Sequence, residues 1–192
     1  MSDVFDILGT DHREVKQMLA DLEAGPTKAN GATQAQLQAR AKLAEKLIIE
    51  SSKHEAVEEL YFWPEVRNRI TNGRQLADHG IGQETEAKEV LALLDKLSAD
   101  ATEFEELLSK YVPAAREHIA YEEGAVWPSL RGALTAAEAE DLGKKLAGAK
   151  KTAPTRPHPH VPPQPGVLKT AGPAVAAADK LRDAMSGRGG RS

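Results

Sequence analysis

The stretch from His54 to Pro64 reads H-E-A-V-E-E-L-Y-F-W-P, and it recurs from His118 to Pro128 as H-I-A-Y-E-E-G-A-V-W-P. Both copies place a Glu four residues after the His and a Trp-Pro pair at the same offset. On a helix, residues i and i+4 lie one turn apart on the same face. Each copy therefore predicts a His–Glu pair directed to one side of a helix.

The repeat extends toward the N-terminus, where Asp11-His12 and Asp78-His79 each precede one copy. His12 lies 42 residues before His54, and His79 lies 39 residues before His118. Internal repeats constrain the architecture more strongly than single motifs do. The chain is therefore predicted to be all-α, with two helical hairpins that form a four-helix bundle around metal ligands from all four helices.

Composition limits the chemistry of this site. The chain has 192 residues and no cysteine, which excludes disulfides, thiolate zinc sites and iron–sulfur clusters, so nitrogen and oxygen must supply the ligands. No apolar run approaches the roughly 20 residues of a membrane span, and the acidic N-terminus is unlike a signal peptide. We expect a cytoplasmic protein with neither a membrane nor a nucleic-acid partner.

Charge divides the chain into two parts. Residues 148–192 carry eight Lys or Arg against two Asp, a net charge of +6, so the preceding residues carry −10 of the overall −4. We predict a metal-binding bundle over residues 1–149 and a flexible, basic, Pro-rich segment over residues 150–192. Within it, residues 150–172 should be an extended linker, and Pro173 to Met185 should form a short helix that either docks a protein partner or keeps the chain soluble.

Five of the candidate ligands fall on the apolar stripes of the first, second and fourth predicted helices. His12 lies between Leu8 and Val15 on the first helix, although a buried histidine with a backbone partner would fit that pattern too. The second helix begins at Thr33 and places His54 and Glu58 where core aliphatic residues belong. A surface ion pair is the alternative, but the register places the pair inside. On the fourth helix, the equivalent inward positions are His118 and Glu122.

The third helix has a stripe of polar residues within its apolar period. The stripe with the 3-4 spacing consists of Leu76, His79, Gln83, Glu86, Val90, Leu93 and Leu97. Gly80 and Gly82 lie beside its polar part, and each costs about 1 kcal/mol relative to Ala inside a helix. They indicate either a loosened turn or a close approach to the backbone.

Other signals mark the ends of helices. Asp100 with Glu103 resembles a capping box for the fourth helix, and Thr135 with Glu138 predicts a short fifth helix that ends near residue 149. Pro64, Pro113 and Pro128 should kink their helices. The two tryptophans at matching offsets, Trp63 and Trp127, are interpreted as packing residues beyond the metal layer.

The six candidate ligands offer too many donors for one tetrahedral ion. Four His and two Glu suit two ions, each with two nitrogens, bridged by two carboxylates. Imidazole and carboxylate fit iron, manganese or zinc, and fewer than six protein donors per ion leave positions open for water, O2 or peroxide. The candidate set is His12, His54, Glu58, His79, His118 and Glu122.

This ligand series resembles that of the hemerythrin-like family, the His-His-Glu cation-binding domain, over residues 3–147. The resemblance implies an up-down-up-down bundle that holds two non-haem iron ions, with or without an oxo bridge between them. Glu58 and Glu122 would bridge the two ions. The resemblance places His12 and His54 on one iron and His79 and His118 on the other. Oxygen-carrying hemerythrins have a second His where this chain has Gln83, so one iron loses a nitrogen unless Glu86 replaces it.

The resemblance implies handling of O2, peroxide or another small diatomic ligand, and oxidative-stress roles rather than oxygen transport. Two classes of function stay open. One is an enzyme with catalase- or peroxidase-like activity, and the other is a module that senses or stores iron or oxygen without turnover. A bundle that uses zinc only for stability is a weaker third alternative.

Overall fold

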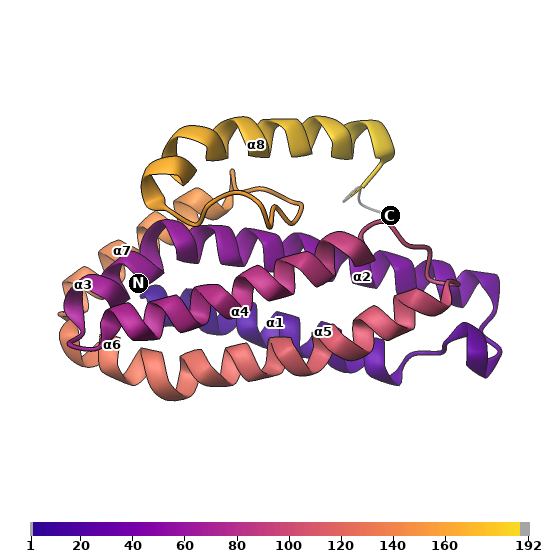
Figure 1. Ribbon diagram of the computed structural model, residues 1–192, viewed down its shortest axis with the longest axis horizontal. Helices are drawn as coiled ribbons and strands as arrows, with labels where there is room; N and C mark the ends of the chain where they lie inside the picture. Colours follow the sequence, from indigo (N-terminus) through magenta and orange to yellow (C-terminus); the bar gives the residue numbers. More distant parts are fainter. Residues whose placement is uncertain (1, 189–192) are drawn as a thin grey trace.

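The computed structural model describes residues 2–188, and in that range the chain consists of helices and the turns between them (Figure 1). Four long helices form the bundle: α1 (Val4–Ala24), α2 (Gln34–Val57), α4 (Gly73–Leu94) and α5 (Thr102–Tyr121). The shorter elements are η1 (Lys28–Asn30), η2 (Glu58–Phe62), α3 (Trp63–Arg69), η3 (Glu122–Val126), α6 (Trp127–Ala133), α7 (Ala136–Lys150) and α8 (Pro165–Ser186). The predicted up-down-up-down bundle is confirmed.

Three helices begin with a reciprocal capping box, in which the N-cap side chain and the residue three positions on satisfy each other's backbone donors. The pairs are Asp3 with Asp6, Thr33 with Gln36, and Thr135 with Glu138. The box predicted for α5 is wrong. Its N-cap is Ala101, without a side-chain cap, because the Asp100 carboxylate accepts the hydroxyl of Ser98 instead.

The two sequence repeats form the same local structure, a helix interrupted by one π-helical turn. The turn begins at Glu58 in the first copy and at Glu122 in the second, and it ends just before the Trp-Pro pair. At its end the backbone N–H of Trp63 donates to the Glu58 carbonyl, and the backbone N–H of Trp127 donates to the Glu122 carbonyl. Such single π turns are rare and concentrate at functional sites. The prolines thus sit in the first turn of α3 and α6, where a missing N–H is tolerated.

A layer of buried polar side chains divides the hydrophobic core in two. One apolar cluster fills one end of the bundle and includes Leu19, Leu47 and Phe104. The other fills the opposite end beneath α7 and includes Leu8 and Leu130. The buried polar residues that lie between them along the helices are Asp11, His12, Ser51, Ser52, His54, Glu55, Glu58, Glu59, Glu84, Lys88 and Glu122. So many buried ionisable groups require partners or cations.

The buried face of α4 lies one residue from the face that the apolar period predicts. The buried stripe runs through Ala77, Ile81, Glu84, Lys88 and Leu91, whereas Leu93 of the predicted stripe is 53% exposed. One residue rotates a helix face by about 100°. The stripe is hard to recognise because two of its members are charged and would ordinarily face water.

The C-terminal segment lies against the bundle. A non-helical strap (residues 151–164) follows α7, and α8 then runs over α2 at the top of the view in Figure 1. The sequence predicts a helix from Pro173, but α8 begins at Pro165, which occupies the first helical turn that proline favours. Within residues 2–188, no helix is long and apolar enough to cross a membrane.

Candidate metal centre

Two groups of metal-binding side chains meet in the polar layer and share two residues. The first group contains His12, His54, Glu58 and Glu122, and the second contains Glu58, Glu84, His118 and Glu122. In each group one ligand atom per residue lies within 4.8 Å of all the others. Because Glu58 and Glu122 belong to both groups, the arrangement suits two cations bridged by two carboxylates.

The helices bring each ligand to the centre from a different side. His12 comes from α1, His54 from α2, Glu84 from α4 and His118 from α5. The shared glutamates open the two π turns, so both repeats deliver a carboxylate to the same point. Among the six residues, Glu58 and Glu122 are 0% exposed, and only His118 is partly exposed.

Each of the three ligand imidazole rings makes a hydrogen bond through Nδ1, on the side that faces away from the centre. His12 donates to Glu123 Oε1 at 3.0 Å, and His54 donates to Asp11 Oδ2 at 3.2 Å. His118 donates to the amide oxygen of Gln83 at 3.1 Å. A proton on Nδ1 leaves Nε2 of a neutral imidazole as the ligand atom, and such outer partners both orient the ring and fix its tautomer.

Ion pairs extend this outer layer toward the surface. Lys16 Nζ lies 2.9 Å from both carboxylate oxygens of Glu123, and Lys150 Nζ donates to Asp11 at 2.6 Å. The last residue of α7 therefore reaches the carboxylate that orients His54.

The inner atoms of the centre are buried and make no hydrogen bonds. They are Nε2 of His12, His54 and His118, both carboxylate oxygens of Glu58 and Glu122, and Oε2 of Glu84. His12 Nε2 lies 3.0 Å from Glu122 Oε2, and His54 Nε2 lies 3.1 Å from Glu58 Oε2, yet neither contact has hydrogen-bond geometry. Buried polar atoms are almost always bonded. Atoms that converge without bonding one another are arranged as ligands of a common cation, so the residues fit a metal pair.

Without a cation, the ionised form of the buried carboxylates at the centre is unfavourable. Burial and the nearby Glu122 raise the pKa of Glu58 to about 8, and burial raises the pKa of Glu84 well above its ordinary value. Burial acts in the same direction on Glu122, but His118 and His12 more than offset it and lower the pKa of Glu122 to about 2. Beside the ionised Glu122, Glu58 and Glu84 therefore retain protons unless further positive charge is supplied. Two divalent ions would supply it.

The two tryptophans of the repeat contact the centre in different ways. Trp63 is 0% exposed and its indole N–H donates to Oε1 of Glu84, which fixes that side chain. Trp127 stacks on the His12 ring, with centroids 5.0 Å apart and planes 14° from parallel. Both residues thus position ligands, whereas the sequence interpretation treats them as packing residues beyond the metal layer.

The close approach suggested by the glycines of α4 is made by Trp63. A Cβ at Gly80 would lie 2.3 Å from an atom of the Trp63 ring, whereas one at Gly82 would meet no atom within 4 Å. Only glycine at position 80 lets the indole cross α4 and reach Glu84.

The structure brings most of the sequence-predicted site residues to the centre and leaves others outside it. Five of the six predicted ligands lie in the two groups, but His79 is exposed and its ring packs edge-on against Tyr121, with centroids 4.7 Å apart. Glu86 is also exposed, and Gln83 contacts His118 rather than the inner atoms. The physical reason is the register of α4, which turns His79 and Glu86 away from the centre.

Glu84 is the site residue that sequence reasoning missed. It lies one residue from Gln83 and is 1% exposed. Two signals point to it in retrospect: the spacing of Glu84 and Lys88 within an otherwise apolar stripe, and the buried indole of Trp63, which requires an acceptor.

Fold and site together define a cation-binding four-helix bundle, and comparison with known proteins gives the family. Residues 3–130 match the family model described as Hemerythrin HHE cation binding domain, so the chain belongs to that family. An uncharacterised hemerythrin-like protein of Schizosaccharomyces pombe is 25% identical over 186 residues, which cover 96% of this chain and 87% of the relative.

A solved structure supports the same fold. The crystal structure of a Hemerythrin HHE cation binding domain-containing protein of Mycobacterium kansasii, a Rv2633c homolog, matches with a TM-score of 0.65 at 18% identity. The match covers 93% of this chain and 99% of that chain, so it extends beyond the bundle into the C-terminal segment.

Proposed function

We propose that the centre binds two iron ions and that the protein breaks down hydrogen peroxide rather than carrying oxygen. The observation that supports this most strongly is the set of inner atoms that are buried, unbonded and convergent. One ion would be held by His12 and His54, and the other by His118 and Glu84. Glu58 and Glu122 would bridge them.

Ligand chemistry favours iron. Imidazole and carboxylate donors suit iron, zinc and manganese, and the chain has no thiolate that would draw zinc into a structural site. Carboxylates can change binding mode when the charge of a metal changes, which suits a redox-active ion. A purely structural zinc site would instead close its coordination with four fixed ligands.

The second half of the centre distinguishes peroxide handling from oxygen carriage. It has one histidine, His118, because Gln83 serves as a hydrogen-bond acceptor for that ring and His79 lies outside. With three histidines for two ions, the ion on the His118 side would have fewer protein nitrogens and would keep more positions open for a small ligand. Reversible carriage requires one defined vacancy instead.

The residues of the chain would bind the ions, orient the ligand rings and enclose the centre. The two shared glutamates would hold both ions, the Nδ1 partners orient the rings, and burial limits the access of bulk water to the centre. Iron, when bound, supplies a Lewis acid and a redox partner for cleavage of the O–O bond. Two molecules of hydrogen peroxide give two of water and one of O2, so no other reductant is required.

The test uses two variants of neighbouring glutamates on one helix. Full-length protein reconstituted with ferrous iron is analysed for iron per chain and for oxygen evolution from hydrogen peroxide. Glu84→Ala should lose one of the two ions and the activity, whereas Glu86→Ala should retain both because Glu86 is exposed. Equal metal content and activity in the two variants would contradict the assignment.

The alternative class gives a different result in the same experiment. A stable, reversible O2 adduct with no oxygen evolution from peroxide would assign the protein to iron or oxygen sensing or storage. Cytoplasmic location and a role in oxidative stress are further parts of the proposal, and the second follows from the expected chemistry.

A further inference from the structure

The two tryptophans of the sequence repeat have different surroundings. Trp63 is 0% exposed, and its indole N–H donates to Glu84. Trp127 keeps part of its surface in solvent, and its indole nitrogen is buried without a hydrogen-bond acceptor among residues 2–188. Buried N–H groups are rarely left without a partner. Trp127 therefore differs from its counterpart in touching both the interior and the surface of the bundle.

The inner contact of Trp127 is with a ligand ring of the metal centre. Its indole stacks on the imidazole of His12, with centroids 5.0 Å apart and planes 14° from parallel, a separation typical of favourable aromatic pairs. Trp63 and His118 make no such stack, because their centroids are 6.4 Å apart and their planes are tilted by 50°. His12 Nε2 is one of the atoms that converge on the centre. One imidazole ring therefore separates the indole of Trp127 from the ion that His12 would hold.

Two exposed arginines flank the same indole. Arg131 lies one turn after Trp127 on α6, and its guanidinium carbon is 4.1 Å from the centroid of the Phe5 ring. That ring meets the indole edge-on, with centroids 5.9 Å apart. On α1, a Cβ at Gly9 would lie 3.5 Å from the Arg13 guanidinium and 3.7 Å from the indole. The surroundings of the indole are therefore basic, although residues 1–147 carry a net negative charge.

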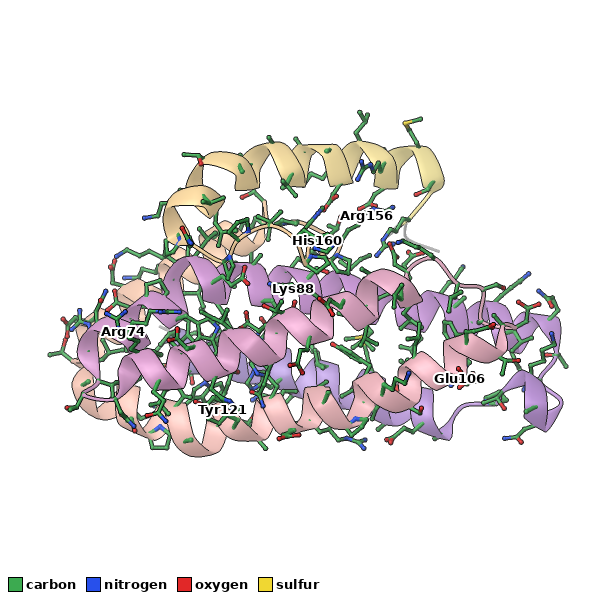
Figure 2. All side chains as sticks on the ribbon, viewed as in Figure 1. Arg74, Lys88, Glu106, Tyr121, Arg156 and His160 are labelled. Carbon is green, nitrogen blue, oxygen red and sulfur yellow. The ribbon has the colours of Figure 1, made fainter. Side chains whose placement is uncertain are left out.

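The C-terminal segment lies over a different side of the bundle. Figure 2 shows Arg156 and His160 of the strap above Lys88, on the α2–α4 side. Helix α6, which carries the indole, lies away from α8 in Figure 1. The Arg131 side chain is 59% exposed, and its contact with Asp3 at 3.6 Å occupies only part of its guanidinium donors. A dissolved anion can therefore approach the arginine beside the indole.

We propose that Trp127 is an electron port, at which the peroxide-oxidised centre takes single electrons from small anionic donors such as enediols and phenol carboxylates. The indole loses one electron to the centre through His12 and regains one from a donor held by Arg131. Because the indole N–H has no acceptor, the ring keeps its proton in both states.

The donors replace the second molecule of hydrogen peroxide as the source of electrons. Each monoanionic donor gives one electron and one proton, so two donors and one hydrogen peroxide yield two waters and two donor radical anions. This further activity rests on the proposed function, since peroxide must first oxidise the centre.

The first test compares two aromatic replacements at position 127 in the full-length di-iron protein. Trp127→Phe keeps a ring beside His12 that is hard to oxidise, whereas Trp127→Tyr keeps one that can be oxidised. Electron paramagnetic resonance after mixing with peroxide and rapid freezing should show an indole radical in the wild type, a tyrosyl radical in the Tyr variant and neither in the Phe variant. Peroxide-dependent oxidation of ascorbate, per bound iron, should fall about tenfold or more in the Phe variant and recover in part in the Tyr variant.

The second test concerns the charge of the donor. Arg131→Gln should slow ascorbate oxidation by about twofold or more at low ionic strength and less at high ionic strength, because a charge near the site steers an anion. Arg116→Gln is the matched control, since it makes the same change at an exposed arginine of α5 that pairs with Glu23. Equal rates in the two variants would overturn the assignment of an anionic donor.

Further outcomes separate the port from the proposed function. Ascorbate oxidation per iron that is equal in the wild type and Trp127→Phe would overturn the port, and so would an indole radical in Trp127→Tyr, where Trp63 is the remaining tryptophan. Oxygen evolution from peroxide without ascorbate oxidation would overturn the port alone. Ascorbate oxidation that requires Trp127, without oxygen evolution, would support the port and overturn the proposed breakdown of peroxide to O2. A wild type that shows neither reaction would overturn both.

Discussion

The indole of Trp63 lies directly against Gly80 of α4 and donates its N–H to the carboxylate of Glu84, one turn further along the same helix. The first repeat thus positions a ligand that the third bundle helix supplies. This contact joins three features that look unrelated in the sequence: the Trp-Pro pair, the glycines of α4 and a buried glutamate.

Gly80→Ala should therefore damage both stability and metal binding. Its Cβ would lie 2.3 Å from the Trp63 ring, so the indole must move and Glu84 loses its donor. We expect a loss of about 1–3 kcal/mol in the free energy of unfolding, as for other overpacked cores. Gly82→Ala is the control and should be neutral or stabilising by up to about 1 kcal/mol. Urea titrations of both variants measure this, and equal effects would contradict the account.

Gln83 should act on one metal ion only, through His118. Gln83→Leu removes the acceptor of the His118 ring, and loss of such an outer partner typically costs about 10–100-fold in metal affinity. Gln83→Glu keeps an acceptor and should retain the affinity. Competition with a coloured chelator measures the two binding constants. A loss of both ions, or of neither, would show that Gln83 does not act by orienting His118.

The metal-free protein should become less stable as the pH rises from 5 to 8. Burial raises the pKa of Glu58 to about 8 and that of Glu55 to about 7, so the folded state binds protons that the unfolded state has released above pH 4.5. Each group then lowers the stability by up to about 1.4 kcal/mol per pH unit until its folded pKa is passed. His54, whose pKa is raised despite its burial, acts in the same direction, and His118, whose pKa burial lowers, opposes it.

Bound cations should reverse this dependence, because they hold the carboxylates in the ionised form. Urea unfolding at four pH values, with chelator and with saturating metal, compares the two states. Glu58→Gln should flatten the slope of the metal-free protein. A metal-free protein whose stability rises steadily to pH 8 would contradict the electrostatic description of the centre.

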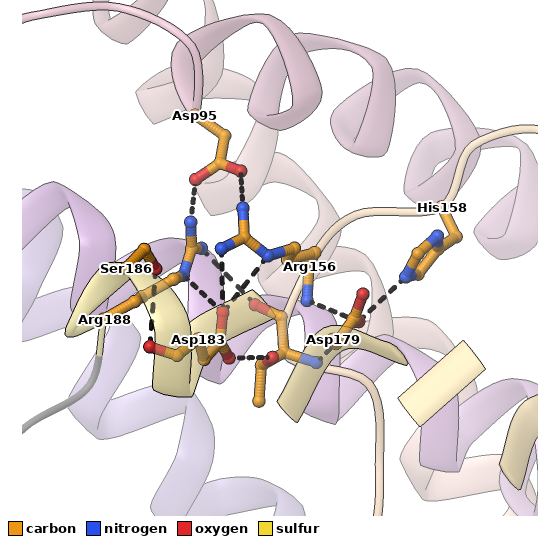
Figure 3. A network of polar contacts seen from close by, with 8 residues as sticks. Asp95, Arg156, His158, Asp179, Asp183, Ser186 and Arg188 are labelled. Atoms are coloured by element: carbon orange, nitrogen blue, oxygen red, sulfur yellow. Dashed lines mark hydrogen bonds and ion pairs between the residues drawn. The ribbon is translucent and has the colours of Figure 1, made fainter. Parts of the chain in front are cut away.

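Asp95 should hold the strap and α8 on the bundle. Asp95→Ala removes the carboxylate that both Arg156 and Arg188 contact (Figure 3), and charge-assisted bonds contribute up to roughly 1.5–3 kcal/mol, less where they are only partly buried as here. Limited proteolysis and hydrogen exchange over residues 155–186 should show faster cleavage and exchange. Glu23→Ala is the control, because it breaks the exposed Arg116–Glu23 pair elsewhere. Unchanged protection in the Asp95 variant would show that other contacts hold the segment.

The duplicated motif predicts the bundle because its information is local and occurs twice. A His and a Glu spaced by one turn must lie on one helix face, and two such helices with similar partners leave few other arrangements. The ligand from α4 could not be predicted in this way. Glu84 becomes interior only when Trp63, Gly80 and Lys88 pack around it, and those contacts depend on tertiary structure.

At one position the internal repeat predicts a different ligand from the residue that faces the centre. By the internal pattern, His79 corresponds to His12, but α4 is rotated so that His79 faces Tyr121 and Glu84 faces the centre. The C-terminal segment shows the same limit, because its Pro-rich composition predicts few contacts. Asp95 of α4 contacts Arg156 of the strap from the bundle, whereas Asp179 and Asp183 of α8 bind the strap within the C-terminal segment. Sequence alone does not show that Asp95 meets a residue 61 positions away.

The central claim is that Glu58 and Glu122 are shared by two iron ions, one on the His12 side and one on the His118 side. Anomalous diffraction at the iron edge, from crystals of the reconstituted full-length protein, tests it most directly. The account predicts two peaks about 3.5–4 Å apart, the usual spacing of two-metal sites, with Glu84 rather than His79 at the second. A single peak, or a second ion bound by His79, would contradict it.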